Sequence, residues 1–132
     1  MITVATTLPK ALKPRGEKDL AHKEVGLWIR EQGIRRPVIV SNLEKVAFYA
    51  DGRYVKMLRA NFEGQMRHAA EEGADYVVVG TESLRYRCPD FPLEGRAGLL
   101  SPVHRQAGDG GSKRDEIIVY RVAKRAEANR DD

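Results

Sequence analysis

The sequence predicts an α/β domain, a three-layer α/β/α sandwich with a Rossmann-like arrangement around a small, mainly parallel sheet of about five strands. Two observations carry this prediction. Residues 76–79, Tyr-Val-Val-Val, form an apolar run bracketed by Gly73 and Gly80, and a second apolar run stands at 37–41. Strands that are apolar on both faces suit a parallel sheet covered on both sides. Helical patterns alternate with these runs, and right-handed crossovers would join them into one sheet.

Length and composition indicate one globular domain. The 132 residues are 42% hydrophobic and 32% charged, and the net charge of +4 comes from 23 basic and 19 acidic residues. Basic residues gather weakly at both ends without interleaved aromatics, so we expect no nucleic-acid partner. No apolar run approaches the ~20 residues of a membrane span, and no signal-peptide pattern is present. Cys88 is the single cysteine, which excludes an internal disulfide.

The chain divides into a lead-in, a domain and a tail. Residues 1–16 contain Pro9 and Pro14 and predict an extended tether. Residues 17–123 form the domain, and 124–132 predict a charged, flexible tail.

The first helix is expected over residues 17–32. It carries a stripe of apolar residues that faces a core. Gly33 follows as the left-handed stop. The stripe predicts that Trp28 is largely buried against the central sheet; its members are Ala21, Val25, Trp28 and Ile29.

The middle of the chain alternates strands and helices. A strand is expected at 37–41, a brief helix at 43–50, and a weaker strand at 54–58 that suits a sheet edge because it carries Lys56. Asn61 is expected to cap a long helix that ends at Gly73. The central strand follows at 75–80.

The last third predicts an antiparallel hairpin. A helical turn at 83–87 and a loop at 88–98 precede a strand at 99–106, in which Pro102 requires either a sheet edge or a place among the strand's first residues. A polar loop at 107–114 leads to a strand at 116–123, where apolar residues run almost without interruption. The expected strand order is 2-1-3, with this hairpin beyond the third strand.

Ligands of such sheets bind beyond the carboxyl ends of the strands, near the switch point. Polar residues stand there and predict a small polar pocket, although helix capping and turn formation explain the same residues and are favoured: Ser41, Asn42, Thr81, Glu82 and Ser83. No glycine-rich phosphate motif follows the first strand, so no nucleotide cofactor is expected. No catalytic constellation stands out. The histidines are scattered over separate elements, and no metal site is expected.

Five segments together resemble a known family. They read Lys-Glu-Val-Gly-Leu-Trp-Ile-Arg at 23–30, Val-Ile-Val-Ser at 38–41, Val-Ala-Phe-Tyr-Ala-Asp-Gly at 46–52, Gly-Ala-Asp-Tyr-Val-Val-Val at 73–79 and Ile-Val-Tyr-Arg-Val at 118–122. In this order the chain resembles, from about Leu8 to Val122, the soluble C-terminal domain of bacterial polyprenyl-phosphate-dependent membrane glycosyltransferases. These enzymes are relatives of dolichyl-phosphate-mannose protein mannosyltransferases and of the aminoarabinose transferases of lipid A.

The resemblance implies a non-catalytic accessory domain at the extracytoplasmic (periplasmic) face of the inner membrane. In that family the catalytic acid and the lipid-phosphate site belong to membrane-proximal parts upstream, and no position of this chain matches them. The implied partners are the membrane-embedded part of the same polypeptide and a nearby lipid surface. The alternative is a stand-alone cytoplasmic α/β domain that binds a small ligand or nucleotide at the strand ends.

Overall fold

The computed structural model describes residues 13–108 and 115–123, with the side chains described from Leu20 onward. Within these ranges four helices and five strands alternate along the chain. Residues 1–12 of the tether predicted at 1–16, residues 109–114 of the loop predicted at 107–114, and the tail at 124–132 lie outside the described residues.

The first part of the fold is α2, β1, α3 and β2. Helix α2 spans Lys13–Glu31, strand β1 Val38–Ser41, helix α3 Glu44–Tyr49 and strand β2 Arg53–Lys56. Helix α2 therefore begins before the predicted start at Glu17. Pro14 stands in its first turn, where a backbone N–H has no intrahelical partner and proline is tolerated.

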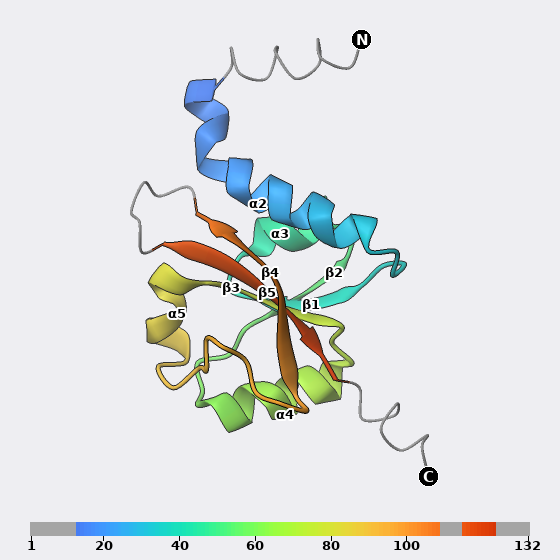
Figure 1. Cartoon of the computed structure of the whole chain (residues 1–132), viewed down its shortest axis with the longest axis vertical. Coiled ribbons are helices and arrows are strands. Elements are labelled where there is room, and N and C mark those ends of the chain that lie inside the picture. Colours follow the sequence, from blue (N-terminus) through green and yellow to red (C-terminus); the bar gives the residue numbers. More distant parts are fainter. Residues whose placement is uncertain (1–12, 109–114, 124–132) are drawn as a thin grey trace.

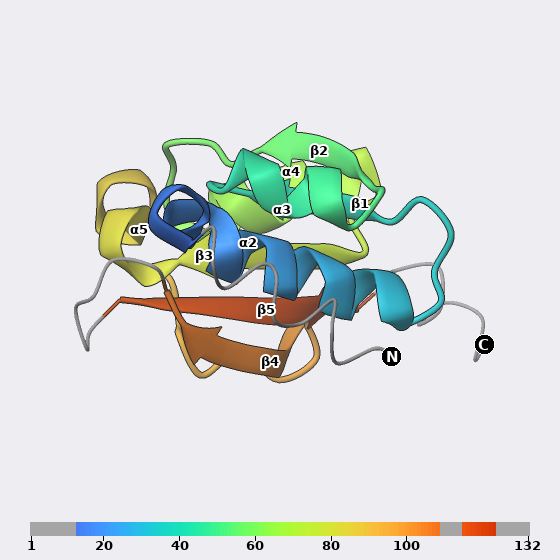
Figure 2. The ribbon, with the colours of Figure 1, turned by 90° about the horizontal axis from the view of Figure 1, so that it is seen from above.

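The second part adds α4 (Phe62–Glu72), β3 (Tyr76–Gly80), α5 (Thr81–Arg87), β4 (Leu100–Ala107) and β5 (Glu116–Val122). The sheet order is β2-β1-β3-β5-β4, which confirms the predicted order, and Figure 2 shows β2 and β4 at its two edges. β1 is parallel to β2 and β3, whereas β5 is antiparallel to β3 and β4. The sheet is therefore mixed rather than mainly parallel, because β5 re-enters it beside β3 in the reverse direction.

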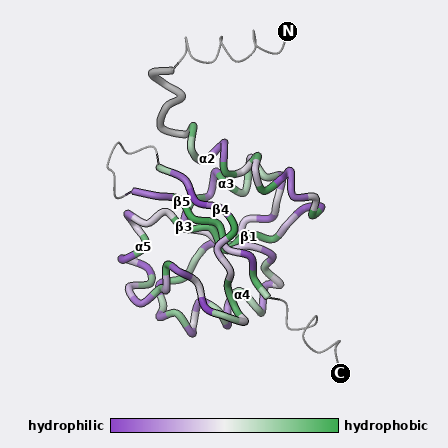
Figure 3. The backbone as a smooth tube through the Cα atoms, viewed as in Figure 1, coloured by the Kyte–Doolittle hydropathy of each residue, from purple (hydrophilic) through white to green (hydrophobic). Residues whose placement is uncertain are grey.

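Helices lie on both faces of the sheet, with α2 and α3 on one side and α4 on the other (Figure 1). The alternation of β3 assigns its side chains to two cores. Val77 and Val79 pack with α4, and Tyr76 and Val78 pack with α2 and α3. All five residues of β3 are buried, as the doubly apolar run predicts, and the hydrophobic colour of Figure 3 concentrates in the central strands.

Local signals fix the ends of α4. The side chain of Asn61 accepts a hydrogen bond from the Gly64 N–H at 2.9 Å, which is the predicted N-cap. Gly73 ends the helix in the left-handed conformation, at φ 70°.

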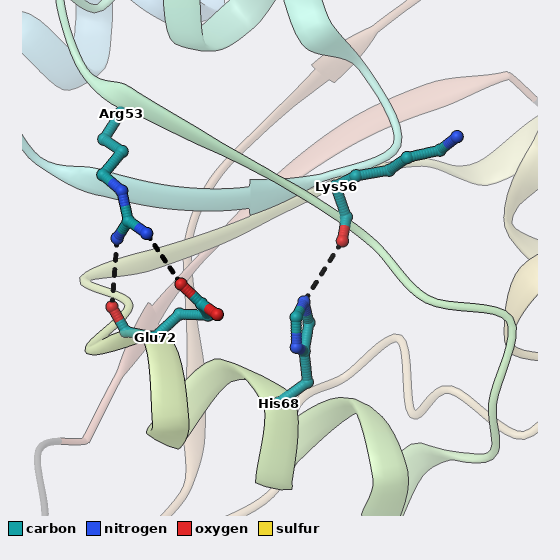
Figure 4. A network of polar contacts seen from close by, with 4 residues as sticks. All are labelled: Arg53, Lys56, His68 and Glu72. Atoms are coloured by element: carbon teal, nitrogen blue, oxygen red, sulfur yellow. Dashed lines mark hydrogen bonds and ion pairs between the residues drawn. The ribbon is translucent and has the colours of Figure 1, made fainter.

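The same helix is tied to the edge strand β2 by polar contacts (Figure 4). Arg53 donates to the Glu72 carboxylate at 2.7 Å and to the Glu72 carbonyl at 3.4 Å. The Nε2 atom of His68 lies 3.2 Å from the Lys56 carbonyl oxygen. The His68 contact occupies a backbone carbonyl that an exposed edge strand would otherwise present.

Trp28 departs from the prediction, since it is only partly buried. Its ring stacks on His104 of β4, with ring centroids 4.6 Å apart and an interplanar angle of 19°. Trp28 lies on the side of α2 that faces the edge strand β4, and this strand covers its ring on one side only. Strand β4 is the predicted edge strand, and its register shifts between Pro102 and His104.

Candidate functional site

The five predicted site residues lie at the carboxyl ends of two neighbouring parallel strands. Ser41 ends β1 and Asn42 follows it, while Thr81, Glu82 and Ser83 form the first turn of α5 directly after β3. The predicted polar turn is therefore the start of a helix, with Gly80 as its N-cap. The structure brings Asn42 and Ser83 into contact.

Asn42 joins the two strand ends with its side-chain amide. Its Oδ1 accepts from the Gly80 N–H at 2.9 Å, and its Nδ2 donates to the Gly80 carbonyl at 3.2 Å. Nδ2 also donates to the Ser83 hydroxyl at 2.8 Å. The amide thus extends the β1–β3 pairing by one position and has its polar atoms occupied.

Ser41 and Thr81 have structural hydrogen bonds as well. The Ser41 hydroxyl is fully buried and accepts from the Leu43 N–H at 2.8 Å, which shapes the entry into α3. The Thr81 hydroxyl accepts from the Glu116 N–H at 2.9 Å and so ties α5 to the start of β5. For Ser41, Asn42 and Thr81, turn formation and capping are what the structure shows.

Glu82 and Ser83 instead line an open recess of about 770 Å³. We call it the carboxyl-edge recess. Its apolar and glycine lining residues are Leu43, Gly80, Gly108 and Ile117, and its polar side chains are His22, Glu82, Ser83, Arg85, Tyr86 and Asp115.

His22 is the site residue that sequence reasoning missed. Its Nδ1 atom is buried and has no hydrogen-bond partner among the described residues. A buried polar atom without a partner costs free energy and calls for an explanation. The available signal was its position on α2, since His22 precedes Val25 and Ile29 by three and seven positions and so borders the apolar stripe.

The charges and the aromatic ring of the recess set its chemistry. Glu82 and Asp115 are acidic and Arg85 is basic, so the recess is mildly negative when His22 is neutral. The Arg85 guanidinium carbon lies 5.1 Å from the centroid of the Tyr86 ring, and Arg85 Nη2 donates to the Tyr86 hydroxyl at 3.3 Å. Tyr86 is nonetheless 63% exposed, which presents a large ring at the recess.

Cys88 lies after α5 but does not behave as a nucleophile. The side chain is buried, and its Sγ donates to the Asp90 carboxylate at 3.4 Å. Burial first, and then the hydrogen bond and the charge of Asp90, raise the pKa of this thiol to about 12. The thiolate, which is the reactive form, is therefore scarce at neutral pH.

Two further findings concern metals and membranes. Across residues 13–108 and 115–123, no three histidine, cysteine or acidic side chains are grouped as ligands of a metal ion. None of the helices in these ranges has both the length and the apolar character needed to cross a bilayer.

Comparison of the chain with models of protein families, with curated proteins and with solved structures finds no match.

Proposed function

We propose that this domain is a binding module of the three-layer α/β/α type that holds a small polar ligand in the carboxyl-edge recess. The observation that carries the proposal is the lining of the recess, because Glu82, Ser83 and Asp115 offer hydrogen-bonding groups beside the exposed ring of Tyr86. The recess also lies beyond the ends of parallel strands, the usual place for ligands in open α/β sheets.

The lining favours a ligand that carries hydroxyl or amino groups. The carboxylates of Glu82 and Asp115 accept hydrogen bonds from such groups, and the Ser83 hydroxyl both donates and accepts. The exposed ring of Tyr86 adds an apolar face against which a sugar or aliphatic chain packs. Monosaccharides, amino sugars and polyamines combine these features.

Phosphate-bearing ligands fit this recess poorly. Two carboxylates repel an anionic group, and Arg85 is already engaged with Tyr86. The turn after β1 also carries no glycine-rich loop whose N–H groups would surround a phosphate. We therefore expect ATP, NAD and nucleotide sugars not to bind there.

A thermal-shift titration tests the proposal. A ligand present at a hundred times its dissociation constant stabilises the folded state by about 2.7 kcal/mol, which is readily measured. We expect a monosaccharide, amino sugar or polyamine to raise the melting temperature, and the variants Glu82→Gln and Tyr86→Ala to reduce the shift. Phe48→Ala is the matched control, because Phe48 is 76% exposed and lies outside the recess.

Two results would contradict this proposal. One is a melting temperature that no member of the three ligand classes changes. The other is an equal loss of the shift in Phe48→Ala and in Tyr86→Ala, which would place binding elsewhere.

A second proposal follows from the order of the resembling segments. The chain would serve as the accessory domain of a polyprenyl-phosphate-dependent membrane glycosyltransferase, on the periplasmic face, where the recess would help to choose an acceptor or cover the mouth of the catalytic site. The segments fall on α2, β1, α3, β3 and β5 in that order, and most of their residues are buried. Buried residues of this kind support a shared fold more directly than a shared activity.

The coding sequence upstream of Met1 tests this second proposal. Long apolar segments in the same reading frame would support it. A stop codon or an unrelated domain there would refute it and leave the ligand-binding proposal standing.

A further inference from the structure

A second recess, of about 330 Å³, lies at the opposite end of the sheet. It precedes β1 and β2, at the amino ends of these strands, and we call it the arginine recess. Its lining comes from the end of α2, the turn into β1 and the turn after α3: Arg30, Gly33, Ile34, Arg35, Arg36, Ala50 and Asp51.

The arginines of this recess have no partners within the described part of the chain. Arg30, Arg35 and Arg36 are exposed, and none of their guanidinium groups makes a hydrogen bond or an ion pair there. By contrast, Arg53 and Arg105 lie near Glu72 and Glu116, at 2.7 and 3.9 Å. Several free, planar guanidinium groups around one hollow are suited to bidentate pairing with the oxygens of an anion such as a phosphate.

Backbone conformation marks the same recess. Arg36 and Asp51 have φ values of 48° and 57°, in the left-handed region. Asp51 has a local reason, because it directly follows the end of α3 and the next residue, Gly52, donates to the Ala47 carbonyl at 3.0 Å, as in a helix-ending turn. The left-handed conformation of Arg36 has no such local reason. Arg36 precedes a proline, and a residue in that position prefers extended backbone. Strain of this kind is typical of functional sites.

Negative groups at the recess oppose an anion but do not outweigh the arginines. Asp51 contributes one negative charge, and the C-terminal ends of α2 and α3 each contribute about half a charge. Three guanidinium groups therefore leave a net positive recess. Arg30 stands in the last turn of α2, where complementing the helix dipole accounts for part of its role; Arg35 and Arg36 lie beyond that turn.

We propose that the arginine recess binds a phosphate group. The group belongs either to a free phosphorylated molecule or to the headgroup of an anionic lipid, and both present the same oxygens to Arg35 and Arg36. This site is separate from the carboxyl-edge recess, so its test is independent of the proposed ligand there.

The test measures binding of inorganic pyrophosphate by calorimetry and, in a second arm, binding to vesicles of phosphatidylglycerol in phosphatidylcholine. Arg35→Gln and Arg36→Gly are expected to weaken binding at least tenfold. Arg59→Gln is the matched control, since Arg59 is exposed and outside the recess. Arg36→Gly also relieves the left-handed backbone, so its melting temperature should not fall, which separates lost binding from lost folding.

The outcomes distinguish the sources. Saturable pyrophosphate binding with this variant pattern supports a free phosphate, and vesicle binding with the same pattern but no pyrophosphate binding supports a lipid headgroup. Absence of binding in both arms would overturn the proposal, as would an equal loss in Arg59→Gln.

Discussion

Replacing Asn42 by alanine tests whether this side chain closes the β1–β3 junction. The substitution removes the hydrogen bonds to the Gly80 N–H, the Gly80 carbonyl and the Ser83 hydroxyl, at 2.9, 3.2 and 2.8 Å. Each such bond contributes a net 0.5–1.5 kcal/mol, and leaving the Gly80 N–H and carbonyl without these partners adds to the loss, so we expect a cost of about 2–3 kcal/mol. A domain of this size loses roughly 3–5 °C per kcal/mol, which predicts a melting temperature lower by roughly 6–15 °C.

Urea denaturation followed by circular dichroism measures this cost, with Ser83→Ala as the comparison. Ser83→Ala removes only the exposed member of the three hydrogen bonds and should cost about 0.5–1 kcal/mol. An Asn42→Ala variant within 0.5 kcal/mol of the parent, or no less stable than Ser83→Ala, would refute the reasoning and return Asn42 to the list of candidate ligand-binding residues.

Three further predictions concern packing and ionisation. Gly26→Ala should lower the free energy of unfolding by about 2 kcal/mol in urea, because the new Cβ would lie 2.5 Å from Tyr49 Cβ and 2.7 Å from the Val46 carbonyl oxygen of α3, and this clash outweighs the helix propensity gained. An unchanged midpoint would contradict this contact. Trp28→Ala should cost about 2–3 kcal/mol, less than the ~3–5 of a fully buried aromatic, because the ring is only partly buried although it stacks on His104; a loss of 5 kcal/mol would contradict the partial burial. Folding raises the pKa of Cys88 from 9.0 to about 12, so between these pH values the folded state keeps a proton that the unfolded state releases. The free energy of unfolding should therefore fall as pH rises from 9 to 12. A Cys88→Ala variant should show a smaller fall over that range in thermal melts.

The fold was predictable where local patterns and burial agree. The apolar run of β3 between Gly73 and Gly80 indicated a strand buried on both faces, and Asn61 and Gly73 marked the two ends of α4. Pro102 correctly assigned β4 to an edge of the sheet.

Other features depend on contacts between segments that are distant in the sequence. The apolar stripe of α2 did not show that Trp28 reaches beyond the covered part of the sheet and stacks on His104. The start of α2 was placed too late because Pro14 was read as a helix breaker rather than a first-turn residue.

The candidate site, like the fold, combines features that the sequence predicts with features that only the folded chain shows. Sequence position predicted that Asn42 and Ser83 lie at neighbouring strand ends. Only the folded chain reveals that the side-chain amide of Asn42 is already hydrogen-bonded to the Gly80 backbone. The recess gains His22 from a helix about 60 positions before α5 and Asp115 from the start of β5, and no local spacing relates them. Tertiary packing alone assembles that lining.

The carboxyl-edge recess is tested most directly by a nitrogen-15 spectrum of the His22 imidazole, recorded while glucosamine, glucose and spermidine are titrated in turn. The account predicts that at least one of them shifts the Nδ1 resonance saturably, together with the amide signals of residues 80–86, because the His22 imidazole lines the recess that the ligand would fill. An Nδ1 resonance that stays fixed with all three, or shifts confined to residues outside the recess, would contradict the account.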